Sequence, residues 1–352
     1  MNIYIETYLF DGNIYKLTSF NDLVRLENYN DIEKLMISGK GYHRFNGSFV
    51  LPDKLKILEC YITISELPEL PDSLEKLKCL NNGLRSLPKL PEGLRVLEYC
   101  MNYMDIVPKL PESLIKLDIR HNELYFLTFH EDGYNNKMPD NLEELYFDNN
   151  KISCIGCTDL PKKLKYLSCS YNNLIGFHGY LNDALLEFNC SNNNLQELPE
   201  LPSNLQILKC SNNHLDNINE LRSNKLVEID ASNNKISSFE LPKSFELENN
   251  LKKVSLFNNN ISVIPNNILQ YTKTEFNYNN NPIMYIISDH IGNDCHISNY
   301  EKYIILKNAV IKIENWFLKV KKNPNYRNCR KRLCEEYEEY EELYNKKQKL
   351  DI

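Results

Sequence analysis

Residues Leu67–Leu97 read LPELPDSLEKLKCLNNGLRSLPKLPEGLRVL, and the phrase LP-x-LP-x-x-L-x-x-L occurs twice within them. The second copy begins at Leu87, 20 residues after the first. A fixed period of about 20 to 50 residues is typical of stacked repeats, in which each structural unit packs only against its neighbours. The stretch therefore predicts a solenoid rather than a globular core.

The repeat extends well beyond this stretch. A template L-x-x-L-x-C-x-x-N-x-L is matched by Leu74, Leu77, Cys79, Asn82 and Leu84. Further copies begin at Leu94, Leu114, Leu142, Leu164, Leu185, Leu205, Leu226 and Leu251, with degenerate copies at Leu55 and around Phe276. About eleven units therefore fill residues 51–283, interrupted by an insertion at Thr128–Asp140. An earlier trace of the same spacing is given by Ile32, Leu35 and Ile37.

The spacing predicts the conformation of each unit. The fourth and sixth side chains of the template lie two residues apart, so they point to the same side of a short strand. Successive strands stack as a parallel sheet about 4.8 Å apart. The asparagine turns inward, where its amide donates to and accepts from the backbone of adjacent turns. The LP pair holds the return segment extended, because proline fixes φ and disfavours helix in the residue before it.

Five cysteines occupy the sixth position of their repeats, and we expect them to be reduced core residues, since a buried thiol behaves as a small hydrophobe. They are Cys60, Cys79, Cys169, Cys190 and Cys210.

This template resembles the leucine-rich repeat over residues 51–283. The LP-x-LP form is similar to the short repeats of bacterial effector proteins, some of which also contain a ubiquitin ligase domain. The richness in Asn, Tyr, Ile and Lys, and the C-terminal tail, resemble repeat proteins of giant DNA viruses that infect amoebae. The resemblance implies an α/β-type solenoid, a horseshoe with a parallel β-sheet on its concave face and an irregular, extended convex side.

The two ends of the chain depart from the template and are expected to cap the repeats. Residues 1–50 form the predicted N-terminal cap, with a β-hairpin in Ile3–Phe20 around the turn residues Asp11-Gly12-Asn13. Residues 284–352 form the predicted C-terminal cap and tail, in which apolar residues at helical spacing indicate two helices separated at Pro324. Blocks of basic and then acidic residues in this tail indicate a solvated face, or alternatively a docking element for a partner's groove.

Composition limits the class of partner. The 352-residue chain has a formal net charge of −7 and no basic stripe in the repeats, which argues against nucleic acid. The N-terminal sequence does not resemble a secretion signal, and no run of apolar residues is long enough to span a membrane. Eleven cysteines in such a chain indicate reduced thiols. We expect a cytoplasmic monomer, in the host cytoplasm if the protein is viral.

The sequence contains no arrangement typical of a catalytic, metal or cofactor site. Cys154 and Cys157 form a C-x-x-C on the outer arc of one repeat, without the second pair of a zinc site. Cys295, Cys329 and Cys334 belong to no nucleophile–base arrangement, and the histidines have no ligand spacing. We therefore predict a protein that is not an enzyme and needs no cofactor.

Recognition is expected where the template leaves residues free, at the third, fifth, seventh and eighth positions on the concave sheet. The predicted partner-binding residues are Ile57, Tyr61, Leu80, Val96, Met101, Arg120, His121, Tyr146, Tyr166 and Tyr171. The same rule selects Ile62 and, in later repeats, small polar residues such as Ser191, Ser211 and Ser232. An exposed apolar and aromatic stripe beside charge is typical of a binding surface.

The predicted function is a non-catalytic module that binds a protein partner on the concave face. Two alternatives follow from the resemblance to bacterial effectors: an adaptor that recruits host ubiquitin machinery through its terminal segments, or a ubiquitin ligase of the effector type. The ligase would need a large helical domain after the repeats, whereas only residues 284–352 follow Ile283.

Overall fold

The structure is a computed structural model that describes residues 3–9, 14–18, 20–43, 50–64, 66–127, 138–155, 160–177, 180–218, 221, 223, 225–240, 250–262 and 274–283. The chain divides into two units, Met1–Ile283 and Met284–Ile352. The predicted C-terminal helices fall in the second unit and lie outside the described residues.

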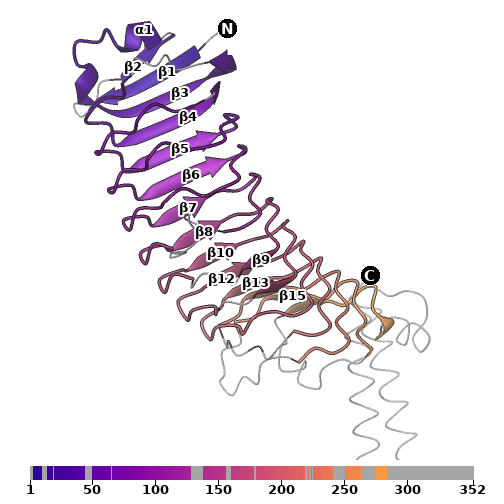
Figure 1. Ribbon diagram of the computed structural model, residues 1–352. Helices are drawn as coiled ribbons and strands as arrows, with labels where there is room; N and C mark the ends of the chain where they lie inside the picture. The colour runs from indigo at the N-terminus through magenta and orange to yellow at the C-terminus, as the bar shows by residue number, and fades with distance from the viewer. Residues whose placement is uncertain are drawn as a thin grey trace, which may run out of the picture. The chain divides into compact units, whose positions relative to one another are not determined.

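The first unit is built on one long sheet (Figure 1), which has 14 strands among the described residues, in the order β16-β15-β14-β13-β12-β10-β8-β7-β6-β5-β4-β3-β1-β2. All neighbouring strands from β3 to β16 pair parallel. These strands are β3 (Ile32–His43), β4 (Ile57–Ile64), β5 (Lys76–Leu80), β6 (Val96–Cys100), β7 (Lys116–Asp118), β8 (Glu144–Tyr146), β10 (Tyr166–Ser168), β12 (Glu187–Asn189), β13 (Ile207–Lys209), β14 (Glu228–Asp230), β15 (Lys253–Ser255) and β16 (Glu275–Asn277). The predicted solenoid with a parallel sheet is confirmed.

The N-terminal end of the sheet is antiparallel. Strand β1 (Ile3–Leu9) pairs with β2 (Ile14–Leu17) as expected for a hairpin, and its other edge pairs with β3. A short helix α1 (Phe20–Leu23) and a 3₁₀ helix η1 (Tyr29–Asp31) follow. Because β3 pairs parallel with β4, the parallel sheet begins within the range predicted as the cap.

A second, two-stranded parallel sheet joins β9 (Cys154–Ile155) to β11 (Gly176–Phe177). Its strands follow the asparagines of two neighbouring repeats, so it lies on the return side of the coil.

The template residues form the core of the coil. Leu74, Leu77, Cys79, Asn82 and Leu84 are completely buried, and most equivalent residues of the other repeats are buried too, whereas Asn234 and Phe276 are partly exposed. All five sixth-position cysteines are buried, as predicted. Burial raises the pKa of the Cys169, Cys190 and Cys210 thiols well above its ordinary value, so they remain neutral.

The second proline of each LP-x-LP phrase has a structural role, because it begins a turn before the strand. The carbonyl oxygen of Pro71 accepts a hydrogen bond from the N–H of Leu74 at 3.0 Å, and Pro91 accepts from Leu94 at 3.1 Å in the next repeat. This bond spans three residues, so each P-x-x-L closes a β-turn that delivers the chain into the following strand.

The asparagines form a ladder through the core. In Asn172, for example, Nδ2 donates to the carbonyl oxygens of Phe147 and Cys169, both at 3.1 Å, and Oδ1 accepts from the N–H of Ile152 at 3.0 Å. The same pattern recurs at Asn122, Asn150, Asn193, Asn213, Asn234, Asn259 and Asn281. Each amide thus satisfies backbone groups of two adjacent turns, which confirms the predicted role.

The residue just before each of these asparagines adopts a left-handed backbone conformation. In ten described repeats the eighth position has a φ between 52° and 58°. The chain leaves the strand through this residue and turns into the return segment. The template treats the eighth position as free, but its backbone conformation is the same in these ten repeats.

Candidate binding surface

The ten predicted binding residues all lie on the outward face of the sheet or at the ends of its strands. Six of them are half-buried, namely Ile57, Tyr61, Leu80, Val96, Tyr146 and Tyr166. Four are exposed, namely Met101, Arg120, His121 and Tyr171. All ten are therefore accessible to a partner.

Some residues that the same rule selected are buried, and for these the prediction was wrong. Ile62 is only 1% exposed, because β4 runs on to Ile64 with strictly alternating burial instead of turning after seven residues of the template. Ser191, Ser211 and Ser232 are also buried. They follow the three-residue strands β12, β13 and β14.

Strand pairing separates the apolar members of the predicted surface. Lys76 lies between Ile57 and Val96, which are its partners on the two adjacent strands. Lys116 and Glu144 lie between Val96 and Tyr166. The surface is therefore not a continuous apolar stripe, as the sequence had indicated, but an alternation of apolar and charged side chains.

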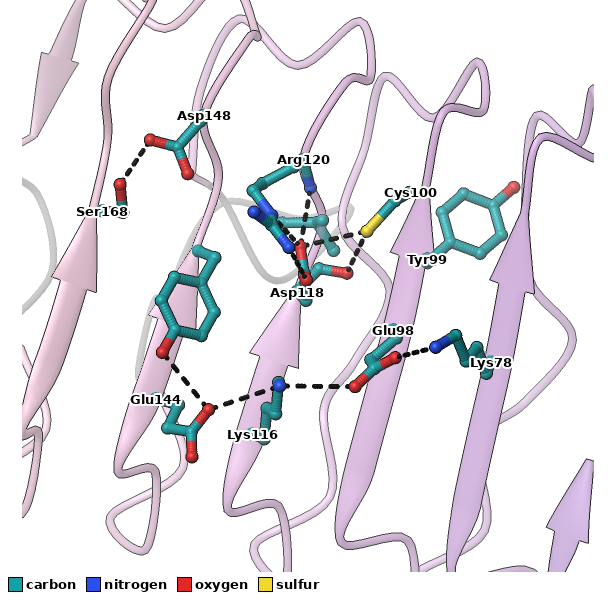
Figure 2. A network of polar contacts seen from close by, with 12 residues as sticks. Lys78, Glu98, Tyr99, Cys100, Lys116, Asp118, Arg120, Glu144, Asp148 and Ser168 are labelled. Carbon is teal, nitrogen blue, oxygen red and sulfur yellow. Dashed lines mark hydrogen bonds and ion pairs between the residues drawn. The ribbon is translucent and has the colours of Figure 1, made fainter. Parts of the chain in front are cut away.

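The charged residues that sequence reasoning missed form a ladder of ion pairs across β3 to β8. Glu59 lies 3.9 Å from Lys34 and 3.8 Å from Lys76, measured between nitrogen and oxygen. Figure 2 shows the next part of the ladder, where Lys116 lies between Glu98 and Glu144 at 3.3 and 3.4 Å. The signal was present in the sequence, because lysine and glutamate alternate at the third and fifth positions of successive repeats.

Glu98 is the best-paired carboxylate of this ladder, with Lys78 at 3.1 Å on its other side. Partial burial by itself would raise its pKa, but the hydrogen bonds and charges of Lys78 and Lys116 outweigh that effect and lower the pKa. Glu98 is therefore ionised at neutral pH and links three strands.

The central feature of the face is Arg120, whose guanidinium is held by a buried carboxylate (Figure 2). Its Nε and Nη2 donate to the two oxygens of Asp118 at 2.8 and 2.7 Å, a bidentate geometry. The guanidinium lies 5.5 Å from the ring centre of Tyr146. Burial opposes ionisation of Asp118, but its bonds to Arg120 and Cys100 lower its pKa. Arg120 still has 46% of its side chain exposed.

Cys100 lies beside this pair but is not arranged as a nucleophile. Its Sγ donates to Oδ1 of Asp118 at 3.0 Å. Burial, together with that hydrogen bond to a carboxylate, raises the pKa of Cys100 to about 12. The thiol is protonated at neutral pH, whereas a reactive cysteine requires its thiolate.

A second buried carboxylate, Asp148, is fully engaged by neighbouring strands. It accepts hydrogen bonds from the hydroxyls of Ser168 and Ser170 and from the N–H of Ser170, the last at 2.8 Å. Asn189 extends the network by donating to the Ser168 hydroxyl at 3.1 Å. These groups stabilise the strand ends rather than offering an empty ligand site.

The remaining sequence predictions about chemistry can be placed only in part. Among the described residues, no three or more His, Cys, Asp or Glu side chains are grouped so that they could hold a metal ion. Cys157 of the C-x-x-C lies outside the described residues, as do Cys295, Cys329 and Cys334. In the part of the chain that is described, no helix has the length and apolar character needed to cross a bilayer.

Comparison with known proteins identifies the architecture. No protein-family model and no curated protein matches the chain. Solved structures do match, among them the functional domain of InlJ from Listeria monocytogenes, described as including a cysteine ladder, at 23% identity over 65% of this chain and 49% of that chain, with a TM-score of 0.50. A leucine-rich repeat protein from Leptospira interrogans matches at 22% identity over 64% and 67% of the two chains, also with a TM-score of 0.50.

A bacterial effector is also among the matching structures. YopM, a leucine-rich effector protein from Yersinia pestis, is 26% identical over 73% of this chain and 81% of that chain, with a TM-score of 0.48. The stacked parallel strands, the buried template residues and the likeness to InlJ and to the Leptospira protein agree on one architecture. The described part of this chain has the leucine-rich repeat solenoid fold.

Proposed function

We propose that this protein is a non-catalytic interaction scaffold that binds a protein partner on the concave face, centred on Arg120 and Tyr146. The observation that supports the proposal most is the fixed guanidinium of Arg120, which is bidentate to Asp118, lies over the Tyr146 ring and yet is nearly half exposed. Arginine and tyrosine are the residue types enriched among binding hot spots.

The fixed geometry of Arg120 favours binding for an energetic reason. Ordering a long side chain on association costs about 0.5–1.5 kcal/mol, and Asp118 and Tyr146 already restrict this one. The lysines of the ladder differ, because the side chains of Lys78 and Lys116 are only 25% and 28% exposed, against 46% for Arg120. Arg120 is therefore the proposed anchor residue, and the ion-pair ladder forms the surface around it.

The wider context supports a binding role. The leucine-rich repeat solenoid presents a long, accessible sheet whose outward residues are not required by the core. The buried, neutral thiols of the coil favour a reducing compartment, and we propose a cytoplasmic location on that ground. Nothing among the described residues favours the ubiquitin-related alternatives over simple binding.

The experiment is affinity capture from a eukaryotic cytosolic lysate on the immobilised full chain, with mass spectrometry to identify retained proteins and titration of the purified partner. Arg120→Ala/Tyr146→Ser should weaken binding of that partner at least about tenfold, as loss of hot-spot residues does. Removing Arg120 leaves the buried Asp118 carboxylate without its bidentate partner, so the thermal unfolding midpoint should also fall, and binding is compared at a temperature at which circular dichroism shows both proteins folded.

The matched control is Ile207→Ser/Lys209→Ala, which alters one apolar and one basic residue on strand β13 of the same face. This variant should bind like the wild type. Equal binding by the wild type and the Arg120/Tyr146 variant would exclude this part of the face as the binding site.

A further inference from the structure

Lysines on the outward face of the sheet occur on strands that lie between two glutamates. From β4 to β16, five described strands have a neighbour on each side that carries an outward glutamate. Four of these five strands also carry an outward lysine, namely β5 with Lys76 and Lys78, β7 with Lys116, β13 with Lys209 and β15 with Lys253. The fifth strand is β10, which has Tyr166 and Ser168 at the two corresponding positions.

Ion pairs explain why lysine is used on these strands. Lys116 lies between Glu98 and Glu144, at 3.3 and 3.4 Å, and so joins the two strands that flank its own (Figure 2). Glu98 has Lys78 on its other side at 3.1 Å, and its side chain is only 15% exposed. A glutamate of this face can therefore accept a lysine from each side.

The two glutamates beside β10 each have a lysine on one side only, among the described residues. Glu144 pairs with Lys116 on β7, and Glu187 pairs with Lys209 on β13 at 3.3 Å, so both lysines lie on the strands away from β10. The two glutamate side chains are 34% and 32% exposed. Both glutamates are in register with Tyr166, so their backbones lie about 10 Å apart at about 4.8 Å per strand. Lys116 bridges the same number of strands.

The tyrosine at this place is suited to contact with a cation. A tyrosine ring attracts an ammonium or guanidinium group that lies over its face. Two other outward tyrosines have such a contact, because Lys78 lies 5.9 Å from the ring centre of Tyr61 and Lys116 lies 5.6 Å from that of Tyr146. In the described part of the chain, no lysine or arginine lies over the half-buried ring of Tyr166.

The charge of the surface at β10 is negative. The third, fifth, seventh and eighth positions of β8, β10 and β12 and of the residues that follow them hold Glu144, Asp148 and Glu187, and no basic residue. Asp148 is buried and is bonded by the hydroxyls of Ser168 and Ser170. Glu144 and Glu187 are therefore the accessible carboxylates, and a basic side chain is complementary to them.

We propose that β10 is the place where this face binds a lysine or arginine side chain of a partner protein. The basic group lies over Tyr166 between Glu144 and Glu187, and it supplies the charge that lysines of this chain supply on β5, β7, β13 and β15. The surface adjoins the proposed binding centre, because Tyr146 is paired in register with Ser168 of β10. This inference rests on the proposed binding function and names the group of the partner that the face selects.

Tyr166→Lys tests whether the place between the two glutamates favours a cation. In this variant the chain supplies its own ammonium group, whereas Tyr166→Met supplies a flexible side chain without charge. The thermal unfolding midpoint of the lysine variant should lie about 1–4 °C above that of the methionine variant. The difference should disappear when each substitution is combined with Glu144→Gln/Glu187→Gln, which removes both carboxylates.

Peptide selection tests what the place binds. A random peptide library displayed on phage is selected on the immobilised full chain, and the wild type should yield sequences with a recurring lysine or arginine. Tyr166→Lys and Glu144→Gln/Glu187→Gln should each lose this preference. They should also bind the peptide selected by the wild type about tenfold more weakly, as expected for loss of a hydrogen bond to a charged group. Binding to the wild type should weaken as salt is added, because salt screens exposed charges.

The matched control is Glu228→Gln/Glu275→Gln, which removes the two glutamates that flank β15, a strand with its own Lys253. This variant should select the same peptides as the wild type. The proposal is overturned if Tyr166→Lys is no more stable than Tyr166→Met, if the wild type selects no basic preference, or if the Glu144/Glu187 variant selects the same peptides.

Partner binding distinguishes this inference from the proposed function. A captured protein that depends on Arg120 and Tyr146, but binds the Glu144/Glu187 variant as tightly as the wild type, would overturn this inference alone. A protein that is lost from the Glu144/Glu187 variant, yet binds the Arg120/Tyr146 variant like the wild type, would support this inference and contradict only the proposed centre.

Discussion

At the scale of single residues, the coil depends on polar atoms that satisfy one another inside the core. The ladder asparagines other than Asn234 are buried, and each one bonds backbone groups of its own turn and of the preceding turn, as Asn172 does. A buried backbone group without a partner costs about 1–3 kcal/mol. The asparagine is therefore a structural residue, as its spacing predicted.

Asn172→Ala should lower the free energy of unfolding by about 2–4 kcal/mol. The substitution leaves the N–H of Ile152 and the carbonyl of Phe147 without the side-chain bonds they have in the native coil. Urea unfolding followed by circular dichroism measures the change. Asn173→Ala is the control, since Asn173 is exposed and its N–H bond to Ile152 is a backbone bond that survives. Similar urea midpoints for the two variants would refute the structural role of the asparagine ladder.

The ion pairs of the face make stability depend on pH in a definite direction. Glu98 has a pKa below its ordinary value of 4.5, and Asp118 has one below 3.8. Carboxylates with lowered pKa values stabilise the folded state above the ordinary value, and that contribution disappears as the pH falls through the folded-state value. We expect the urea midpoint to fall below about pH 4.5.

Glu98→Gln isolates one part of this effect. The variant should be less stable than the wild type at about pH 7, and the difference should shrink as the pH falls below the ordinary glutamate value of 4.5 and Glu98 becomes protonated. A difference in urea midpoint that stays constant over this range would show that the ion pairs with Lys78 and Lys116 do not stabilise the fold.

At the scale of the strand and its repeat, stability comes from leucines that pack between turns. Leu145 in β8 and Leu208 in β13 are completely buried, and each is paired in register with leucine or another apolar residue on both sides. Each repeat contacts only its neighbours, so damage to one unit should spread mainly to the adjacent units.

Leu145→Ala and Leu208→Ala should each lower the free energy of unfolding by about 2–5 kcal/mol, through lost burial and the cavity that remains. Hydrogen exchange should rise most in the strands flanking the substituted one. Leu80→Ala, on the outward face of β5, is the control and should cost less because Leu80 is only half-buried. If urea melts place both core variants at the wild-type midpoint, these leucines do not pack inside the coil.

The repeat template predicted the inward half of each unit well, because burial dictates those residues. Leu77, Cys79 and Asn82 follow from spacing alone, and the structure confirms them. The outward half was harder to predict. Sequence reasoning missed the ion pairs around Glu98 because it selected binding residues by their apolar character. The alternating charges were nevertheless visible in the sequence. Ile62 was misplaced because β4 continues straight where later repeats turn.

The backbone of the eighth position was also not predicted. Its repeated asparagines are the signal, since asparagine tolerates the left-handed region, but a side-chain template does not record φ. The bidentate contact of Arg120 with Asp118 depends on side-chain conformations that spacing does not fix.

At the scale of the whole molecule, we propose that the outward face of the sheet from β4 to β10 binds a protein. The core residues are repeated from unit to unit, whereas this face differs in charge and side-chain size from one strand to the next. A long surface of varied residues on a repeated framework is suited to recognition of a large partner.

Site-specific photo-crosslinking tests this claim most directly. A benzophenone amino acid is placed in turn at Val96 and Tyr166 on the face, and at Glu92 and Lys162, which are exposed on the turns that precede the strands. We expect one cytosolic protein to crosslink at Val96 and Tyr166 and at neither turn position. Crosslinking of that protein at Glu92 or Lys162, with none at Val96 and Tyr166, would place recognition on the turns and contradict the claim.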